Sequence, residues 1–210
     1  MIKSTIIFTI LFLTSVAVHA QKQSPKIILP TGHLGGVTKL NISPNKKLLL
    51  TEDFNSDIII IESDKLIEIQ RNNYGQKKIT SSTFLNDSSI ISICNDTLIS
   101  VWNFYSDKVD LYPISVNLNK LYVEKHGLYC IDNNGTVFRF QISGKQTILK
   151  ELIKDKANEV YFKSEKEILI VNRHNLIFSD LNRSKKIKRN FNSQITALSW
   201  NTEGKPTYTN

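Results

Sequence analysis

The sequence predicts an all-β fold built from repeated four-stranded antiparallel sheets. Three columns of residues recur along the chain with a period of about 40 residues. Between turn residues, the chain shows short alternating strand patterns and almost no helical periodicity. Repeats of four strands with this period are typical of the blades of a β-propeller.

The three columns fix the register of the copies. The first column is a large apolar residue: Ile61, Trp102, Phe140 and Phe178. Shortly before each of these lies an Asn or Asp, and this second column consists of Asn55, Asp96, Asn134 and Asn172. Asx side chains bond their own backbone and tolerate left-handed geometry, so we expect a turn there in every copy. The third column ends an alternating run: Ile42, Phe84, Val123, Phe162 and Trp200.

The columns divide the chain into four complete blades and a partial fifth. We expect the complete blades at residues 36–70, 78–113, 117–151 and 157–189, and the partial blade at residues 194–210. In the second copy the strand patterns cover residues 78–84, 89–94, 97–103 and 108–113. Polar turns such as "FLNDSS" separate the first and second strands of a copy.

The residues around these columns resemble WD repeats. The stretch that opens the first copy contains a Gly-His pair, Gly32-His33, and the second copy ends in Trp102-Asn103, which is similar to the Trp-Asp pair of that family. The resemblance covers the chain from about Lys26 to its last residue. It implies a propeller fold in which the following residues have structural roles: His33, Asn55, Asp96, Trp102, Asn134, Phe140, Asn172 and Phe178.

The copies depart from the fullest pattern of that family. Its most complete blades link His, Ser or Thr, Asp and Trp in one buried hydrogen-bond network, and no copy here has all four. Ile61 stands where a Trp would accompany His33. We therefore expect these blades to depend more on apolar packing between neighbours than on that network.

The predicted ring is incomplete. Residues 26–30, "KIILP", resemble the outer strand that closes the last blade of a WD-repeat propeller, whereas the partial blade supplies only two strands. Unpaired strands and uncovered apolar faces invite pairing with other chains. We expect either a piece of a longer propeller, a last blade completed by further chain or another subunit, or a small five-blade ring.

The N-terminal segment has the features of a secretory signal peptide. Lys3 provides a positive charge, an apolar run extends from Thr5 to Val18, and small residues surround Ala20. The run is shorter than the roughly 20 residues that a bilayer requires. We expect cleavage near Ala20, a mature chain that does not span the membrane, and a periplasmic or secreted location.

The chain is basic, with a formal net charge of +8. Its densest cationic run consists of Arg183, Lys185, Lys186, Lys188 and Arg189. This run fits an outer strand whose lysines prevent pairing with another chain, and it could also hold an acidic partner or an anionic membrane. No recognisable nucleic-acid module is present, so we expect no nucleic-acid partner.

The residue types that carry catalysis do not form a recognisable pattern. His19 falls within the predicted signal peptide, and His126 and His174 lie in predicted turns without a second metal ligand at suitable spacing. Cys94 and Cys130 lie in apolar strand patterns and are expected to be buried free thiols. We expect no metal site and no cofactor, and a protein that is not an enzyme.

Partner binding is the function that the resemblance implies. In WD-repeat proteins, the loops between the second and third strands and between successive blades commonly dock partners. Those loops here carry Phe54, Arg71, Tyr74, Arg173 and His174, and aromatic and Arg side chains are frequent interface anchors. The sequence thus favours an exported scaffold for protein–protein interaction.

Two other functions remain open from the sequence. The opening "ILPTGH" resembles bacterial multidomain WD-repeat proteins, so the chain could be the N-terminal sensing part of a larger enzyme, such as a caspase-like cysteine peptidase. A carbohydrate- or cofactor-binding propeller is the third possibility.

Overall fold

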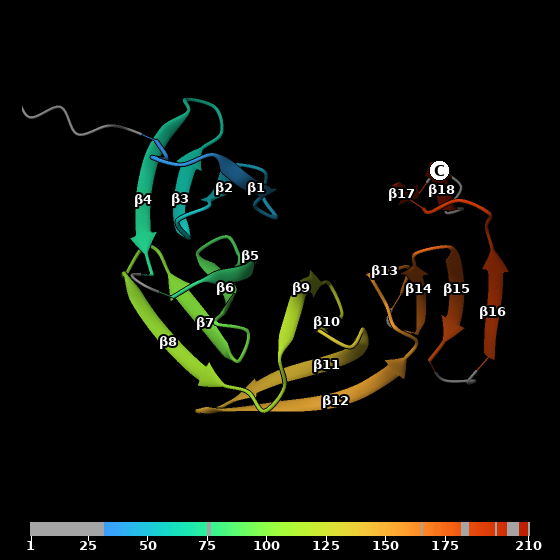
Figure 1. The fold of residues 1–210 in the computed structure, drawn as a ribbon. Helices are drawn as coiled ribbons and strands as arrows, with labels where there is room; N and C mark the ends of the chain where they lie inside the picture. Colours follow the sequence, from blue (N-terminus) through green and yellow to red (C-terminus); the bar gives the residue numbers. More distant parts are fainter. Residues whose placement is uncertain are drawn as a thin grey trace, which may run out of the picture. The chain divides into compact units, whose positions relative to one another are not determined.

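The described part of the chain consists of β-strands and turns. The structure is a computed structural model that describes residues 32–74, 77–164, 166–181, 185–195, 197–200 and 206–209. Within these ranges no residue is helical. The strands form four sheets of four antiparallel strands and one sheet of two strands, each built from consecutive strands (Figure 1).

The first two sheets follow each other directly in the sequence. The first contains β1 (Val37–Ile42), β2 (Leu48–Asp53), β3 (Asp57–Glu62) and β4 (Ile67–Asn73). The second contains β5 (Ile79–Asn86), β6 (Ser89–Cys94), β7 (Leu98–Asn103) and β8 (Lys108–Pro113). The strands of the second sheet begin and end within two residues of those expected from the sequence.

The remaining sheets repeat this order. The third contains β9 (Leu118–Glu124), β10 (Gly127–Asp132), β11 (Thr136–Ser143) and β12 (Gln146–Lys154). The fourth contains β13 (Glu159–Phe162), β14 (Glu167–Asn172), β15 (Asn175–Asp180) and β16 (Lys185–Asn190). A two-stranded sheet, β17 (Ala197–Trp200) and β18 (Pro206–Thr209), follows.

Apolar side chains fill the space between the first and second sheets. The second strand of a sheet points alternate residues to opposite faces, and because both faces are covered, its sequence is a nearly continuous apolar run. In β6 all six residues are buried. Four residues of the first sheet and four residues in and beside the second form one core cluster: Leu48, Leu50, Ile58, Ile60, Phe84, Ile90, Trp102 and Phe104.

Alternate residues of β6 belong to different cores. Ile90 packs toward the first sheet, whereas Ile91 and Ile93 pack with Cys130 and Phe140 of the third sheet. A third cluster joins the third and fourth sheets through Ile131, Val137, Ile153, Ala157, Val160, Ile168, Ile170 and Ile177. Face-to-face packing of successive sheets therefore provides the cores, as the sequence predicts.

Apolar side chains are exposed on the first and last strands of the first sheet. Leu40 and Ile42 on β1 are each 57% exposed, and Ile67 and Ile69 on β4 are exposed as well. Within the described residues the sheets do not close into a ring, because the strands of the first sheet contact those of the second sheet and not those of the later sheets. The expected architecture of four complete blades, a partial fifth and an open ring is confirmed.

Several predictions concern residues outside the described ranges. These are the signal peptide at residues 1–20, the closing strand at residues 26–30, and Arg183 of the cationic run. In the part of the chain that the structure describes, no helix could cross a membrane.

Candidate partner-binding face

The turns between second and third strands lie at the same end of the sheets as the linkers between sheets. In the second sheet, the N–H of Asn95 donates to the carbonyl of Lys78 at 2.9 Å, which ties the β6–β7 turn to the preceding linker. In the third sheet, the N–H of Asn133 donates to the carbonyl of Asn117 at 2.9 Å. We call the surface formed by these turns and linkers the loop face.

Phe54 is the most exposed aromatic side chain of the loop face. It lies in the β2–β3 turn and is 81% exposed. A Cβ atom on Gly36 would lie 3.1 Å from the ring, so the Gly36 backbone passes close beside Phe54. Asn55, the neighbouring turn residue, is exposed, and its N–H donates to Asp53 Oδ1 at 2.8 Å. The structure thus holds an exposed aromatic ring on a fixed turn.

A buried row of three polar side chains fastens this turn to the segment before β1. His33 Nε2 lies 2.7 Å from Thr51 Oγ1, and His33 Nδ1 lies 3.2 Å from Asp53 Oδ2. The side chains of His33 and Asp53 are 5% and 0% exposed. The order Asp, His and hydroxyl is that of a hydrolase triad, but burial of Thr51 leaves its hydroxyl out of reach of a substrate.

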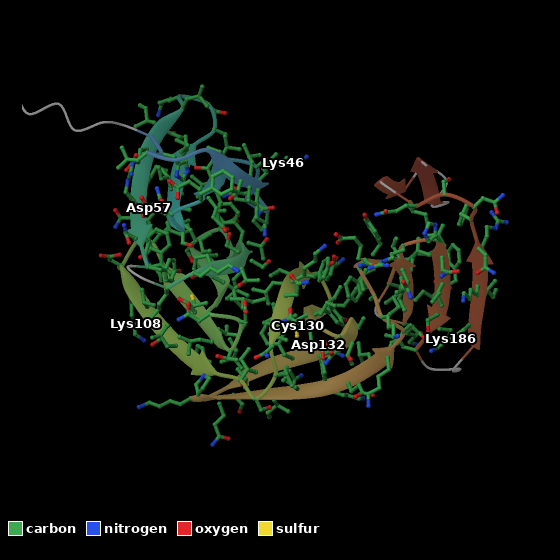
Figure 2. The ribbon with its side chains drawn as sticks, in the orientation of Figure 1. Lys46, Asp57, Lys108, Cys130, Asp132 and Lys186 are labelled. Carbon is green, nitrogen blue, oxygen red and sulfur yellow. The ribbon has the colours of Figure 1, made fainter. Side chains whose placement is uncertain are left out.

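Asp53 is the anchor of the turn. Burial disfavours its charge, but the N–H groups of Asp57, Asn55 and Gly35 outweigh that effect and hold the pKa of Asp53 below its ordinary value. Asp132 repeats the arrangement in the third sheet, where its Oδ1 accepts the N–H groups of Asn134 and Thr136 at 2.9 and 2.7 Å (Figure 2).

Sequence reasoning missed Thr51 and Asp53. It assigned the turn of the first copy to Asn55, and it named His33 without these two partners. A signal was present, because Thr51 and Asp53 are two residues apart on one strand and so point to the same face.

Arg71 supports the fold next to this row. It lies on β4, its Nη2 donates to the carbonyl of Gly32 at 2.8 Å, and it pairs with both carboxylate oxygens of Glu68. The hydrogen bonds from Arg71 hold the pKa of Glu68 below its ordinary value. The predicted interface residue Arg71 therefore has its side chain engaged within the first sheet.

Tyr74, another predicted interface residue, is packed against the core between two sheets. Its ring packs against the core cluster between the first and second sheets, and Ser100 Oγ donates to its hydroxyl at 3.4 Å. Burial raises the pKa of Tyr74. In this position the side chain contributes to packing between sheets.

Arg173 and His174 lie in the β14–β15 turn, and both side chains are exposed. The N–H of Arg173 donates to Asn158 Oδ1 at 3.0 Å, and its carbonyl accepts the N–H of Ile195 at 2.9 Å. The turn faces a hollow of about 360 Å³ between the third and fourth sheets. We call this the loop-face hollow, and six polar residues line it: Asn133, Asn134, Lys156, Asn158, Asn172 and Arg173.

The other residues of the repeat columns occupy turns, cores and, for Asn172, the last position of β14. Trp102 is fully buried, and its Nε1 donates to Asp107 Oδ1 at 3.0 Å. Asp96 accepts a hydrogen bond of 2.5 Å from the Thr80 hydroxyl. Asn172 Nδ2 donates to the carbonyl of Asp155 at 3.0 Å. Phe140 belongs to the core between the second and third sheets, and Phe178 packs on the far face of the fourth.

A second hollow follows the first strands of the sheets. This inner groove has a volume of about 480 Å³, and its lining includes Lys39, Ser81, Lys120, Tyr122, Glu124 and Glu159. Lys120 pairs with Glu159, which also accepts a 2.8 Å hydrogen bond from the Tyr122 hydroxyl. Burial lowers the pKa of Lys39 and raises that of Tyr122. The Lys120–Glu159 ion pair and the Tyr122–Glu159 hydrogen bond therefore tie the third sheet to the fourth.

The described residues contain no group of three or more His, Cys, Asp or Glu side chains that could hold a metal ion. Cys94 and Cys130 are buried free thiols. Burial raises the pKa of Cys94 to about 11 and that of Cys130 to about 12, so neither thiol has the thiolate character of a nucleophile.

Comparison with solved structures identifies the fold. The β-propeller domain of Cps50 (Swd1) from Myceliophteria thermophila is similar to this chain with a TM-score of 0.64 and 13% identity, covering 84% of this chain and 62% of that one. The RRP9 WD40 repeats give a TM-score of 0.59 at 14% identity, covering 77% of this chain and 51% of that one. The structure of U3-55K gives a TM-score of 0.61 at 15% identity, covering 77% of this chain and 51% of that one.

These likenesses show the fold, and the resemblance to WD40 propellers is confirmed at that level. No model of a known family matches the sequence, and no curated protein does. The chain spans less than two thirds of each of these solved propellers. It therefore corresponds to part of a WD40-type ring.

Proposed function

We propose that this chain is a non-catalytic, exported scaffold that holds a protein partner on its loop face. Propellers of the WD40 fold typically serve as platforms for protein–protein interaction, which is an argument from fold and not from a site. The buried thiols and the buried Asp53–His33–Thr51 row are consistent with a structural use of the residue types that catalysis requires.

The observation that carries the proposal is the fixed exposure of the side chains on the loop-face turns. Phe54 projects from a turn whose backbone is bonded to Asp53, and Arg173 and His174 project from a turn bonded to Asn158 and Ile195. Binding by side chains on a rigid backbone loses little conformational entropy. Exposed aromatic and Arg side chains on such a scaffold suit a protein interface.

Cross-linking from single positions tests the proposal. The photoreactive residue p-benzoylphenylalanine would replace Phe54 or His174 in the full chain, expressed in its source cells. Two matched control positions, Leu66 and Tyr105, are exposed in turns at the opposite end of the sheets. We expect protein adducts of defined mass from Phe54 or His174 only. Equal adducts from all four positions, or none from any, would contradict the proposal.

Export is supported by the N-terminal segment. The apolar run and small residues before Gln21 are those of a cleaved signal peptide. Fractionation of source cells followed by N-terminal sequencing tests this part. We expect the protein outside the cytoplasm, beginning near Gln21, and an uncleaved cytoplasmic chain would contradict export.

A sensing part of a larger enzyme, such as a caspase-like peptidase, is the second candidate. The exposed apolar side chains on β1 and β4 of the first sheet favour a larger assembly, because exposed apolar surface is often covered by a partner. An antibody against the chain would detect a species well above 24.0 kDa in denaturing electrophoresis if the enzyme exists. A single band near that mass would leave the scaffold as the function.

A further inference from the structure

We infer that the loop-face hollow between the third and fourth sheets binds an acidic segment of a protein partner. The inference rests on the proposed function, because it specifies the chemistry that one part of the loop face recognises. The hollow is lined by the β10–β11 turn, the linker before β13 and the β14–β15 turn.

The lining of this hollow carries positive charge without a compensating carboxylate. Lys156 and Arg173 are exposed, and neither side chain makes an ion pair or hydrogen bond within the described residues. The nearest acid in the sequence, Asp155, is already paired with Lys186 at 2.6 Å. Two cations on one small surface attract a carboxylate and exclude a basic partner.

Carboxamide groups complete the lining. Asn133, Asn134 and Asn158 are exposed beside the two cations, and their side chains both donate and accept hydrogen bonds. An extended peptide needs such partners for its own N–H and carbonyl groups, while its carboxylates meet the cations. The combination therefore suits an acidic peptide segment better than an isolated inorganic anion.

The backbone of the hollow is fixed before a partner arrives. Lys156 and Arg173 have positive φ angles of 52° and 43°, typical of tight turns. The N–H of Ala157 donates to the carbonyl of Gly135 at 2.8 Å, and the N–H of Asn158 donates to that of Val171 at 2.7 Å. The backbone positions that carry the two cationic side chains are thus fixed, which limits the ordering cost of binding to that of the side chains themselves.

The inner groove is a weaker candidate for the same ligand. Its Lys120 is paired with Glu159, and Glu124 adds a second negative charge to the lining. An acidic segment there would have to displace Glu159 from both Lys120 and Tyr122.

The loop-face hollow is also large enough for the proposed ligand. Its volume of about 360 Å³ is sufficient for a few side chains of a peptide.

Fluorescence anisotropy with the full mature chain tests the inference. The probe is a labelled peptide of alternating Glu and Ser residues, and the control peptide carries Gln in place of Glu. We expect the Glu peptide to bind more tightly than the Gln peptide, and its affinity to fall as sodium chloride is raised. The double variant Lys156→Gln with Arg173→Gln should weaken binding of the Glu peptide about tenfold.

The matched control removes two exposed lysines at the opposite end of the third sheet. Lys125 and Lys145 lie in the β9–β10 and β11–β12 turns. Their double Gln variant lowers the net charge equally and should change the affinity less than twofold. Equal loss in both double variants, or no preference for the Glu peptide, would overturn the inference. Binding that depends on Lys156 and Arg173 but is made to phosphatidylglycerol vesicles and not to the Glu peptide would also overturn it.

The two proposals fail separately. If cross-links form at Phe54 or His174 while the Glu peptide is not preferred, the scaffold function stands and the acidic segment is wrong. If the peptide binds through Lys156 and Arg173 but no cross-link forms in cells, the chemistry of the hollow stands and the scaffold function is wrong.

Discussion

The buried carboxylate of Asp53 is the polar residue on which the first loop-face turn depends. Its Oδ1 accepts the N–H groups of Asn55 and Asp57 at 2.8 and 3.0 Å, and its Oδ2 lies beside His33. Hydrogen bonds to an ionised acceptor are stronger than those to a neutral one, so the charge of Asp53 stabilises the turn that carries Phe54.

Replacing this carboxylate should make stability depend on pH in a defined way. We expect Asp53→Asn to lower the free energy of unfolding by about 1–2 kcal/mol at neutral pH. Because the folded-state pKa of Asp53 is lowered, its contribution is complete above the ordinary aspartate pKa of 3.8 and is lost as pH falls through the folded-state pKa. Urea unfolding of both proteins between neutral and acid pH measures this. A difference that does not shrink in acid would contradict the role of the charge.

A second prediction concerns the chemical reactivity of the two thiols. Cys94 and Cys130 are fully buried, and burial raises their pKa to about 11 and about 12. We expect neither to react with iodoacetamide at pH 8 in the folded protein, and both to react after unfolding in urea. Mass spectrometry counts the added groups. Rapid labelling of the native chain would place a thiol at the surface.

The positions of the turn residues were partly predictable from the sequence. The Asx column located the turns of three copies, since Asn55, Asp96 and Asn134 lie in them, whereas in the fourth copy Asn172 is the last residue of β14 and the turn follows it. It did not identify Asp53 as the partner of His33, because the segment Asp53–Asp57 contains three Asx residues and local pattern does not distinguish them. Likewise, the contacts of Tyr74 and Arg71 are made with residues distant in sequence, which local pattern does not contain.

At the scale of elements, the third-sheet turn and the linker that follows β12 approach each other closely at Gly135. This glycine has a φ of +79°, and a Cβ atom there would lie 2.5 Å from the backbone carbon of Lys156. Only a residue without a side chain fits this contact.

Two glycine-to-alanine substitutions distinguish the destabilising effect of a steric clash at this close approach from the effect of an unfavourable φ alone. We expect Gly135→Ala to destabilise the protein by about 2–4 kcal/mol, because it adds a clash to an unfavourable φ. Gly144→Ala is the control, since Gly144 has a φ of +61° but nothing within 4 Å of its added Cβ, and should cost about 1 kcal/mol. Thermal unfolding compares them. Equal losses would show that the linker does not pack against the turn.

The first sheet offers a test of which face is buried. Leu50 on β2 is 0% exposed and faces the second sheet, whereas Leu40 on β1 is 57% exposed. We expect Leu50→Ala to lower the free energy of unfolding by about 2–5 kcal/mol and Leu40→Ala by less than about 0.5 kcal/mol. Denaturant unfolding measures both. A large loss for Leu40→Ala would mean that a further sheet or another chain covers that face.

The strand positions were predictable because turn residues and alternating apolar runs are both local features of the sequence. In the second sheet the turns and alternating runs place β6 and β8 at the observed residues, and β5 and β7 differ by one or two. The assignment of Ile90 to one core and Ile91 to the other follows from the alternation of side chains along a strand.

At the scale of the whole molecule, stability comes from contacts between neighbouring sheets. The first sheet contacts the second through β1, β2 and β5, and the second contacts the third mainly through β5 and β9. Ion pairing and hydrogen bonding of Lys120 and Tyr122 with Glu159 join the third to the fourth. This arrangement resembles other repeat proteins, in which each unit is stabilised mainly by its neighbours.

The repeat period predicted the number of sheets but not which apolar side chains of the first sheet are exposed. The apolar residues of β1 and β4 are compatible with a core position in the sequence, and the structure leaves Leu40, Ile42, Ile67 and Ile69 exposed. Periodicity counts the repeats within a chain and carries no information about which apolar side chains stay exposed.

The central claim is that successive sheets pack face to face through their apolar side chains. Nuclear Overhauser effects in methyl-labelled protein test it most directly, between methyl groups of Leu50, Ile58 and Ile60 and the aromatic rings in and beside the second sheet. We predict cross-peaks to Phe84, Trp102 and Phe104, the aromatic members of the same core. Cross-peaks confined to residues within single sheets, with none between sheets, would contradict the account.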